Sequence, residues 1–360
     1  MIFSIFLVAL FIQLIYPIFI FSRLAFYREE VNNHSSDAKI SVVVCCKNEI
    51  RHLETLVTYL LHQTYSNYEV IIVDDASSDG SWEYLQTIQH PKLSVHRFQK
   101  KIAGKKEVLH FGIQQAAYDW ILVCDADCRP ASAQWIESMS CKLIDSATEI
   151  VLGVAPYIET ASKINLWSRY ENFMTAVFYL SMALSKHAYM GVGRNMLFKK
   201  ELYLDVFEKI IAINTLSGDD DLFVNAASSR MNTRINIDKN SFVYSASKES
   251  FQAFITQKTR HISTGYQYKI IDKIILAAYP ISFLFLLITY IWILFFIPAV
   301  LISASILFLG YLTSSMLVKT YCAEKLHFRS KIPVFILDIL YLCYQIMIHP
   351  LYLSNKNKSW

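Results

Sequence analysis

The chain has 360 residues, of which 54% are hydrophobic and 18% charged, and its formal net charge is +4. So small a basic excess, with no basic stretch interleaved with aromatic residues, argues against a nucleic-acid partner. The seven cysteines form no repeated C-x-x-C pairs, which is typical of a reducing compartment rather than of a disulfide framework. The hydrophobic residues gather at the two ends and leave a middle, about 39–269, of ordinary globular composition.

Residues 1–22 are predicted to be a transmembrane anchor. The run 1–21 is almost wholly apolar, and about 20 apolar residues are enough to span a bilayer. A cleaved signal peptide would carry its positive charge before the apolar run, whereas here Arg23 follows it. We therefore expect an uncleaved anchor with its N-terminus outside and Arg23 on the cytoplasmic side. The polar residues 23–39 are predicted to be a linker.

Residues 40–270 are predicted to form one α/β domain. Short apolar runs indicate strands, and apolar residues at helical spacing indicate the helices between them. The expected strands lie at 40–46, 70–73, 93–98 and 120–123, with helices at 50–61, 81–88 and from 104 onward. This alternation predicts a mostly parallel, doubly wound sheet. Two further strands within 231–244 and a helix at 251–265 complete the domain.

Two of the predicted strands end in pairs of carboxylates, Asp74-Asp75 and Asp125-x-Asp127. The ends of parallel strands meet at one rim of the sheet, where ligands of such folds bind. Carboxylates gathered there repel one another unless a cation or a polar ligand separates them. Aspartate is also common in plain turns, but oxygen ligands suit Mg²⁺ or Mn²⁺, and Lys105 can offer charge to a phosphate.

Two segments of the middle allow more than one interpretation. The apolar residues of 164–190 recur at steps of three and four and predict a long helix, either in the core or along a membrane surface. The loop 191–195, with two glycines and Arg194, is predicted to be flexible and to line an acceptor site, although glycine pairs also serve plain turns. Cys124 and Cys128 flank the D-A-D motif, where we expect a structural rather than a zinc or redox role.

Residues 271–360 are predicted to be a transmembrane region of about three helices. Apolar spans are expected at 277–296, 299–317 and 332–353, with Pro298 between the first two. The basic segment 319–331 is expected to face the cytoplasm. The last stretch either spans or lies at the membrane surface. The near absence of charge within the spans argues against a transporter.

Seven short motifs occur in one order between residues 40 and 265. They are S-V-V-V-C-C-K-N-E, I-I-V-D-D-A-S-S-D-G-S, A-G-K-K-E-V-L, V-C-D-A-D, G-V-G-R-N-M-L-F, S-G-D-D-D-L and Q-K-T-R-H. Together they resemble membrane-bound family 2 glycosyltransferases, which are inverting enzymes of the GT-A fold. The resemblance implies a mixed, mostly parallel α/β sheet with N- and C-terminal transmembrane helices.

The resemblance also implies roles for particular residues. The nucleotide sugar would be bound by Glu49, Asp74, Asp75, Lys105, Asp125, Arg194 and Asp219, and the divalent metal, Mg²⁺ or Mn²⁺, by Asp125 and Asp127. Asp220 resembles the catalytic base, and Gln257 and Arg260 resemble the pair that closes over the diphosphate. The family usually has Trp after that Arg, whereas His261 stands here, which argues against processive synthesis.

These residues predict sugar transfer from a nucleotide diphosphate sugar, expected to be a UDP-sugar, to a lipid-linked or glycan acceptor. A cation with Arg260 and Lys105 would stabilise the leaving diphosphate, and Asp220 would take the proton of the acceptor hydroxyl. One base opposite the leaving group predicts inversion. The acidic stretch 217–221 alone is also typical of a helix start. We expect a multi-pass protein of the inner (plasma) membrane with a cytoplasmic catalytic domain. The alternatives are a processive polysaccharide synthase of the same fold and a catalytically silent membrane scaffold.

Overall fold

The computed structural model describes residues 1–29, 37–99, 101, 104–213, 215 and 217–355. Much of the predicted linker 23–39 and the tail after residue 355 lie outside the described residues. The chain forms two compact units. Unit 1 contains 1–27, 170–181 and 250–360, and unit 2 contains 28–169 and 182–249. The units therefore divide the chain at other points than the predicted domains, since 250–269 groups with the apolar helices.

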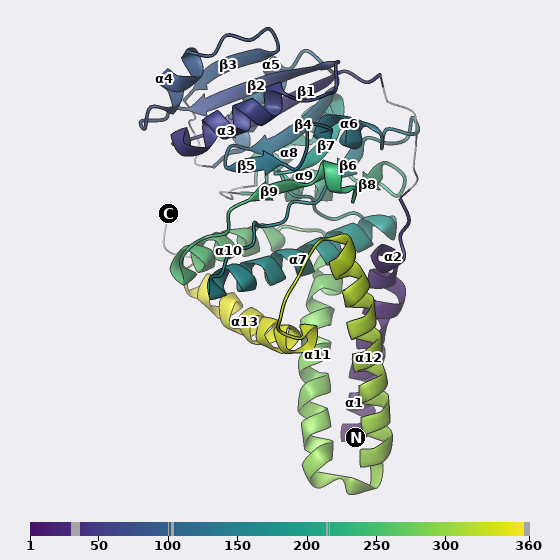
Figure 1. The fold of residues 1–360 in the computed structure, drawn as a ribbon. Helices are drawn as coiled ribbons and strands as arrows, with labels where there is room; N and C mark the ends of the chain where they lie inside the picture. The colour runs from purple at the N-terminus through teal and green to yellow at the C-terminus, as the bar shows by residue number, and fades with distance from the viewer. Residues whose placement is uncertain (30–36, 100, 102–103, 214, 216, 356–360) are drawn as a thin grey trace. The chain divides into compact units, whose positions relative to one another are not determined.

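Unit 2 is built on a sheet whose described strands run in the order β3-β2-β1-β4-β7-β6-β8 (Figure 1). The strands are β1 (Ile40–Cys46), β2 (Tyr68–Asp75), β3 (Leu93–Phe98), β4 (Trp120–Asp125), β6 (Ile150–Leu152), β7 (Met196–Lys199) and β8 (Thr233–Ile235). The neighbours among β1 to β4 pair in parallel, as predicted, whereas β7 is antiparallel to both β4 and β6. A separate antiparallel pair joins β5 (Cys128–Pro130) to β9 (Val243–Ser245).

The helices of unit 2 cover the sheet with their apolar sides. They are α3 (Ile50–Leu61), α4 (Ser81–Gln86), α5 (Lys106–Gln115), α6 (Trp135–Ser140), α8 (Lys200–Ile211) and α9 (Asp221–Ala227), with the 3-10 turn η2 (Lys239–Ser241). The apolar positions of α3, among them Leu53 and Leu60, are fully buried in a core with β1, β2 and β4. Strands buried on both faces explain why these runs read as continuously apolar.

Some boundaries differ from the predicted ones. Helix α5 begins at Lys106 rather than at Gly104, whose φ of 109° is not helical. The long helix α7 (Lys163–Leu184), which contributes residues to both units, ends before 190 because Lys186 takes a left-handed φ of 59°. Helix α8 was not predicted.

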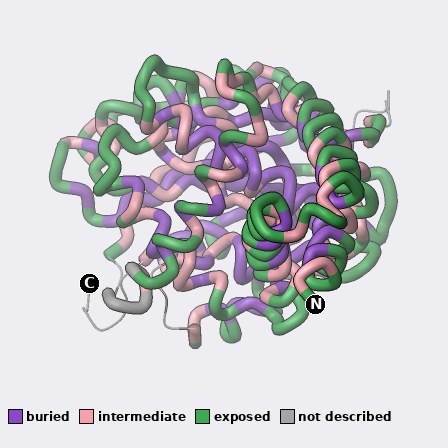
Figure 2. The backbone as a smooth tube through the Cα atoms, turned by 90° about the horizontal axis from the view of Figure 1, so that it is seen from below, coloured by how far each residue is buried: buried purple, intermediate pink, exposed green. Residues whose placement is uncertain are grey.

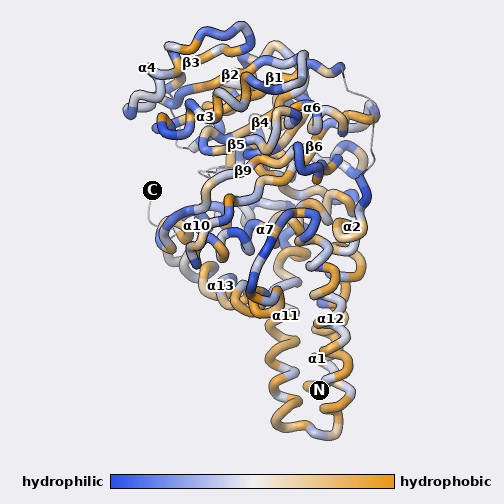
Figure 3. Tube along the Cα trace, in the orientation of Figure 1, coloured by the Kyte–Doolittle hydropathy of each residue, from blue (hydrophilic) through white to orange (hydrophobic). Residues whose placement is uncertain are grey.

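Unit 1 consists mainly of helices. They are α1 (Ile2–Ile15), the π-helical turn η1 (Tyr16–Phe21), α2 (Ser22–Ala25), α10 (Phe251–Gly265), α11 (Ile270–Phe296), η3 (Pro298–Val300), α12 (Leu301–Lys325) and α13 (Val334–Asn355). Within the described residues, three helical segments are long and apolar enough to cross a membrane: Ile2–Ala25, Ile270–Phe296 and Pro298–Lys325. Figure 3 shows the hydrophobic colour along them, and Figure 2 shows many outward residues of the helices exposed.

The last predicted span differs from the other three in its length and in its course. The apolar part of α13, Val334–Pro350, is shorter than these segments, and the helix runs across α11 and α12 rather than along them (Figure 1). A span at 332–353 therefore stays a prediction, and this course favours the surface alternative. The basic segment expected from Lys319 is in fact helical as far as Lys325.

Unit 1 also buries polar side chains that the sequence patterns did not reveal. Lys319 is fully buried, and its Nζ lies 2.6 Å from Asp338 Oδ1 and 2.9 Å from the hydroxyl of Tyr279. Gln13 is equally buried and donates to the carbonyl oxygen of Tyr279 (2.6 Å), while the Tyr311 hydroxyl donates to its Oε1 (2.7 Å). Buried polar groups paired in this way join α1, α11, α12 and α13 into one bundle.

Candidate active site

The D-A-D motif lies at the carboxyl end of β4. The strand ends at Asp125, Asp127 follows in a turn, and Cys128 begins β5. One ligand atom from each of these three residues lies within 4.8 Å of the others, and both carboxylates are partly exposed. The predicted cation ligands Asp125 and Asp127 are therefore together, and a buried thiol lies beside them.

Lys105 joins this cluster to the start of α9. Its Nζ forms an ion pair with Asp125 Oδ1 and lies 3.9 Å from Asp219 Oδ2. Burial alone would lower the pKa of Lys105, but the charges of Asp125 and Asp219 outweigh it and raise that pKa. Burial, followed by the neighbouring charge of Asp220, raises the pKa of Asp219 to about 6, against the opposing effect of Lys105. Lys105 is thus a charged side chain held among carboxylates.

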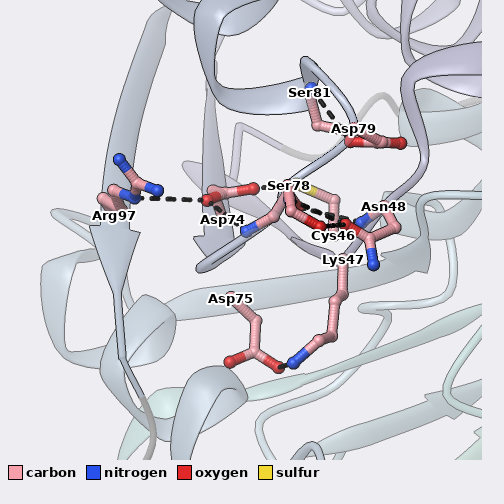
Figure 4. A network of polar contacts seen from close by, with 10 residues as sticks. Cys46, Lys47, Asn48, Asp74, Asp75, Ser78, Asp79, Ser81 and Arg97 are labelled. Carbon is pink, nitrogen blue, oxygen red and sulfur yellow. Dashed lines mark hydrogen bonds and ion pairs between the residues drawn. The ribbon is translucent and has the colours of Figure 1, made fainter.

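The two carboxylates that end β2 point in different directions (Figure 4). Asp74 is fully buried and accepts from Ser77 N (3.1 Å), with Arg97 Nε at 3.8 Å. Asp75 instead lies 3.4 Å from Lys47 Nζ. Successive side chains of a strand alternate between its faces, so this divergence follows from the extended backbone. Asp74 is engaged in the loop after β2, and Asp75 is the one of the pair that faces Lys47.

Cys45 shows that acidic groups from separate elements do gather. Burial raises the pKa of this thiol to about 12; Lys105 opposes the rise, whereas Asp219, Asp125 and Asp75 add to it. In the parallel ladder Cys45 is level with Asp125, and Lys105 joins Asp125 to Asp219, so predicted site residues of β4 and of the stretch before α9 come together near the end of β1.

Glu49 stands at the end of the β1–α3 connection. The turn begins at Asn48, whose φ of 57° is left-handed and whose Oδ1 accepts from Ser78 N at 2.9 Å. Glu49 N donates to Ser81 Oγ (3.0 Å), and its carboxylate lies 2.7 Å from His52 Nδ1. The loops after β1 and β2 are thereby bound together, which positions Glu49.

Asp220 is held by two backbone donors. It occupies the N-cap of α9, where Oδ1 accepts from Asp221 N at 2.8 Å, and Oδ2 accepts from Gly193 N at 2.6 Å. A Cβ at position 193 would lie 3.1 Å from Asp220 Oδ2. The acidic helix start expected within 217–221 is thus present, with α9 beginning at Asp221, and Gly193 is a contact that sequence reasoning missed. The glycines of G-V-G-R were the available signal.

The loop 191–195 is more firmly held than predicted. Asn195 is fully buried, accepts from Trp135 Nε1 (3.0 Å) and donates to the carbonyl oxygens of Val154 (2.9 Å) and Ser241 (2.7 Å). The guanidinium of Arg194 donates to Ser245 Oγ.

Arg194 also links this loop to the cation cluster. Its guanidinium lies 4.8 Å from the Tyr157 ring centroid. Burial would lower the pKa of Arg194, but its electrostatic interactions with Tyr157, Cys128, Asp125 and Asp127 raise it. The predicted flexibility of the loop is therefore wrong, because its side chains are fixed by buried hydrogen bonds.

Gln257 and Arg260 lie on α10 of unit 1. Gln257 is half-buried and Arg260 is exposed, and Lys258 between them is buried in an ion pair with Glu171 of α7. Their part in binding the diphosphate stays a prediction.

Comparison with known proteins supports the fold and the type of domain. Residues 41–207 match the family described as "Glycosyl transferase family 2". The "Poly-beta-1,6-N-acetyl-D-glucosamine synthase" of Staphylococcus aureus is 32% identical over 88 residues, which are 24% of this chain and 21% of that protein. "Glycosyltransferase GlyG" of Streptococcus pneumoniae is 31% identical over 116 residues, 32% of this chain and 38% of the other. The chain thus aligns with only about a fifth to two fifths of these curated relatives.

A solved structure resembles the chain over most of its length. It is the mannosyltransferase PcManGT of Pyrobaculum calidifontis, in complex with GDP-Man and Mn²⁺. The TM-score is 0.55 at 17% identity, and the match covers 90% of this chain and 98% of the other. The likeness establishes a GT-A-like fold, as the sequence motifs implied.

Proposed function

We propose that this chain transfers a sugar from a nucleotide diphosphate sugar to an acceptor, a function supported by the match of residues 41–207 to the family described as "Glycosyl transferase family 2". The donor is a UDP-sugar, the acceptor is lipid-linked or a growing glycan, and the anomeric carbon is inverted. The observation that carries the proposal is the cluster around Lys105, where Asp125 and Asp219 from different elements face one cationic side chain.

The nucleotide end of the donor is assigned to the loops after β1 and β2. Glu49 ends the connection after β1 and pairs with His52, and Asp75 ends β2 and pairs with Lys47. Both pairs are with side chains that are about half exposed, whereas Asp74 is fully buried and accepts from the backbone of the β2 loop. Carboxylates accept hydrogen bonds from the N–H groups of a base and from ribose hydroxyls. Of the residues predicted for this role, Asp75 is the strongest candidate and Asp74 the weakest.

The donor set at the end of β4 fits a divalent cation. Asp125 and Asp127 supply hard, partly exposed oxygen atoms close together, as Mg²⁺ and Mn²⁺ require. A bound cation would neutralise charge on the diphosphate as it leaves. Lys105 lies beside the same carboxylate and can contribute its charge to the diphosphate, as can Arg260 by the family resemblance.

Asp220 is assigned as the general base. The backbone donors of Gly193 and Asp221 fix its carboxylate, and each oxygen keeps a lone pair for an acceptor hydroxyl. Taking that proton in the transition state contributes about 10²–10⁴-fold to the rate. With this one base on the face opposite the leaving diphosphate, the acceptor displaces the diphosphate in a single step, which gives inversion.

The membrane helices suggest the acceptor. Three described segments are long and apolar enough to span, one before and two after the residues 41–207 that match the glycosyltransferase family. We assign the protein to the inner membrane with its catalytic domain in the cytoplasm, where nucleotide sugars are available. Arg260 and Gln257 on α10 precede the first residue of α11, Ile270, by 10 and 13 positions, which favours acceptors that reside in the membrane.

A processive polysaccharide synthase is the second candidate, because one curated relative carries that name. His261 in place of the family's Trp favours transfer of one or a few sugars. The length of the product on a gel separates the two functions.

The test is nucleotide release from a panel of UDP- and GDP-sugars by the full chain in detergent with Mn²⁺ and membrane lipids as acceptors. We expect the Asp127→Ala and Asp220→Asn variants to lose transfer. The matched control is Asp205→Asn on the exposed side of α8, which should keep it. Transfer that survives both site variants, or a product of retained configuration, would contradict the proposal.

A further inference from the structure

Cys128 is the one member of the cation cluster that the proposed reaction does not use. It directly follows Asp127 and is 4% exposed, so its thiol is part of the interior. The sequence alone favoured a plain structural role. The structure instead places its Sγ within 4.8 Å of a carboxylate oxygen of both Asp125 and Asp127.

The spacing of these atoms suits a shared metal ion. The Cys128 thiol donates a hydrogen bond to Asp127 Oδ1, with Sγ and Oδ1 3.5 Å apart, and a bound metal ion would take the place of the thiol proton. A tetrahedral site with one sulfur at about 2.3 Å and one oxygen at about 2.0 Å from a zinc ion separates the two ligand atoms by about 3.5 Å. This pair of ligand atoms therefore needs little movement to coordinate one ion.

The position of the thiol is fixed by the sheet. Cys128 begins β5 and pairs with Ser245 of β9, and Ser245 in turn accepts a hydrogen bond from Arg194. Arg194 interacts electrostatically with Cys128, Asp125 and Asp127. The guanidinium offsets the mutual repulsion of these groups in the metal-free protein, and a bound dication would take over that role from Arg194.

We propose that Cys128 is a third, sulfur ligand of the cation site, through which thiophilic ions such as Zn²⁺ and Cd²⁺ bind in competition with Mg²⁺ or Mn²⁺. Thiolate selects softer ions, whereas Mg²⁺ takes the carboxylate oxygens alone. On binding, the S–H bond is replaced by a sulfur–metal bond and the proton passes to solvent. The inference rests on the proposed cation site, and it makes Zn²⁺ an inhibitor of the enzyme.

The experiment follows sulfur-to-Cd²⁺ charge-transfer absorption in the ultraviolet as the full chain in detergent is titrated with Cd²⁺. All seven cysteines, which lie within the described residues, are free thiols. The titration is therefore run in a Cys141→Ser/Cys343→Ser background, which removes two of the more accessible thiols. We expect one band per chain in this background and its loss with Cys128→Ser.

The same variants show how much Cys128 contributes to the affinity for Cd²⁺. Mutation of residues that only support metal ligands costs about 10–100-fold in affinity, so loss of a ligand should weaken Cd²⁺ binding at least about tenfold. Asp127→Asn should also weaken it. Binding of Mn²⁺, followed by its electron paramagnetic resonance signal, should persist in Cys128→Ser and shows that the variant is folded. An unchanged Cd²⁺ affinity in this variant would overturn the proposal.

One measurement needs no variant at position 128. Excess Mn²⁺ should abolish the Cd²⁺ band of the background protein, because the two ions share Asp125 and Asp127. A band that Mn²⁺ leaves unchanged would place the thiolate elsewhere and refute the proposal.

The readouts are independent of sugar transfer. If the band requires Cys128 but transfer is never found, the inference stands and the proposed function fails. If transfer that depends on Asp127 is found but the Cd²⁺ band is unchanged in Cys128→Ser, the proposed function stands and the inference about Cys128 fails.

Discussion

Gly193→Ala tests whether the backbone of the 191–195 loop orients the proposed base. In the native protein Gly193 N lies 2.6 Å from Asp220 Oδ2. An added Cβ would lie 3.1 Å from both Asp220 Cβ and Oδ2, so the carboxylate must shift by a few tenths of an ångström. Only the position of Asp220 should change, because Gly193 is not among the residues with a left-handed φ.

The expected fall in kcat follows from the energy of the hydrogen bond between Gly193 N and Asp220 Oδ2, which the added methyl group disturbs. A hydrogen bond to a charged group contributes roughly 1.5–3 kcal/mol, and each 1.36 kcal/mol of barrier is a factor of ten in rate. We expect kcat to fall by roughly 10- to 150-fold. The KM for the donor should change little, because the glutamate and aspartate assigned to the nucleotide lie on other loops.

The assay is the initial rate of nucleotide release at varied donor concentration, with near-ultraviolet circular dichroism to confirm folding. Gly310→Ala is the matched control, since nothing lies within 4 Å of the Cβ it adds. A Gly193→Ala enzyme whose kcat stays within about twofold of wild type, while Asp220→Asn is inactive, would refute the orienting role.

Two further predictions concern stability. Because the folded protein raises the pKa of Asp219 from 3.8 to about 6, the native state binds more protons than the unfolded chain between these values, and stability falls as the pH rises through that window. Asp219→Asn should therefore raise the melting temperature more at pH 7.5 than at pH 4.5. Lys319→Met leaves Asp338 buried without its ion-pair partner and should cost roughly 3–5 kcal/mol, seen as a lower melting temperature in detergent.

Each stability prediction has its own control. Asp205→Asn makes the same chemical change on an exposed surface and should show no such pH dependence. If Asp219→Asn stabilises equally at both pH values, its ionisation is not the cause. For the buried pair, Lys319→Met/Asp338→Leu should recover much of the loss, because both charges are then removed. A double variant as unstable as Lys319→Met would contradict the pairing.

The central strands could be predicted because continuous apolar runs in the sequence indicate strands that are buried on both faces. The runs at 40–46 and 120–125 are largely apolar on both faces, and polar residues mark where each ends: Lys47 and Asn48 follow the first, and Asp125 closes the second. Helices α3 and α10 agree with their predicted bounds, 50–61 and 251–265, since apolar spacing or a capping serine marks their limits. Local patterns of this kind carry enough information to place these elements.

Contacts between distant segments could not be predicted in this way. The antiparallel β7 is only four residues long, and its place beside β4 is set by pairing rather than by its own pattern. Asn195 looked like part of a mobile loop, yet its amide joins three segments by buried hydrogen bonds. The burial of Lys319 likewise depends on Asp338, a residue on another helix.

In the candidate site, too, local sequence patterns predict some contacts and leave others out. The D-A-D spacing was enough to bring Asp125 and Asp127 together, because both follow one strand. The adjacent Asp74 and Asp75 diverge, since alternation along a strand sends neighbours to opposite faces. The approach of Gly193 to Asp220 joins residues 27 positions apart, and a single sequence does not reveal it.

The most direct test of the account is a structure of the full chain in detergent or lipid with UDP and Mn²⁺. We predict Mn²⁺ bound by Asp125 and Asp127, the diphosphate within reach of Lys105, and the base and ribose beside Glu49 and Asp75. A nucleotide bound away from the carboxyl ends of β1, β2 and β4, or Mn²⁺ held by other residues, would contradict it.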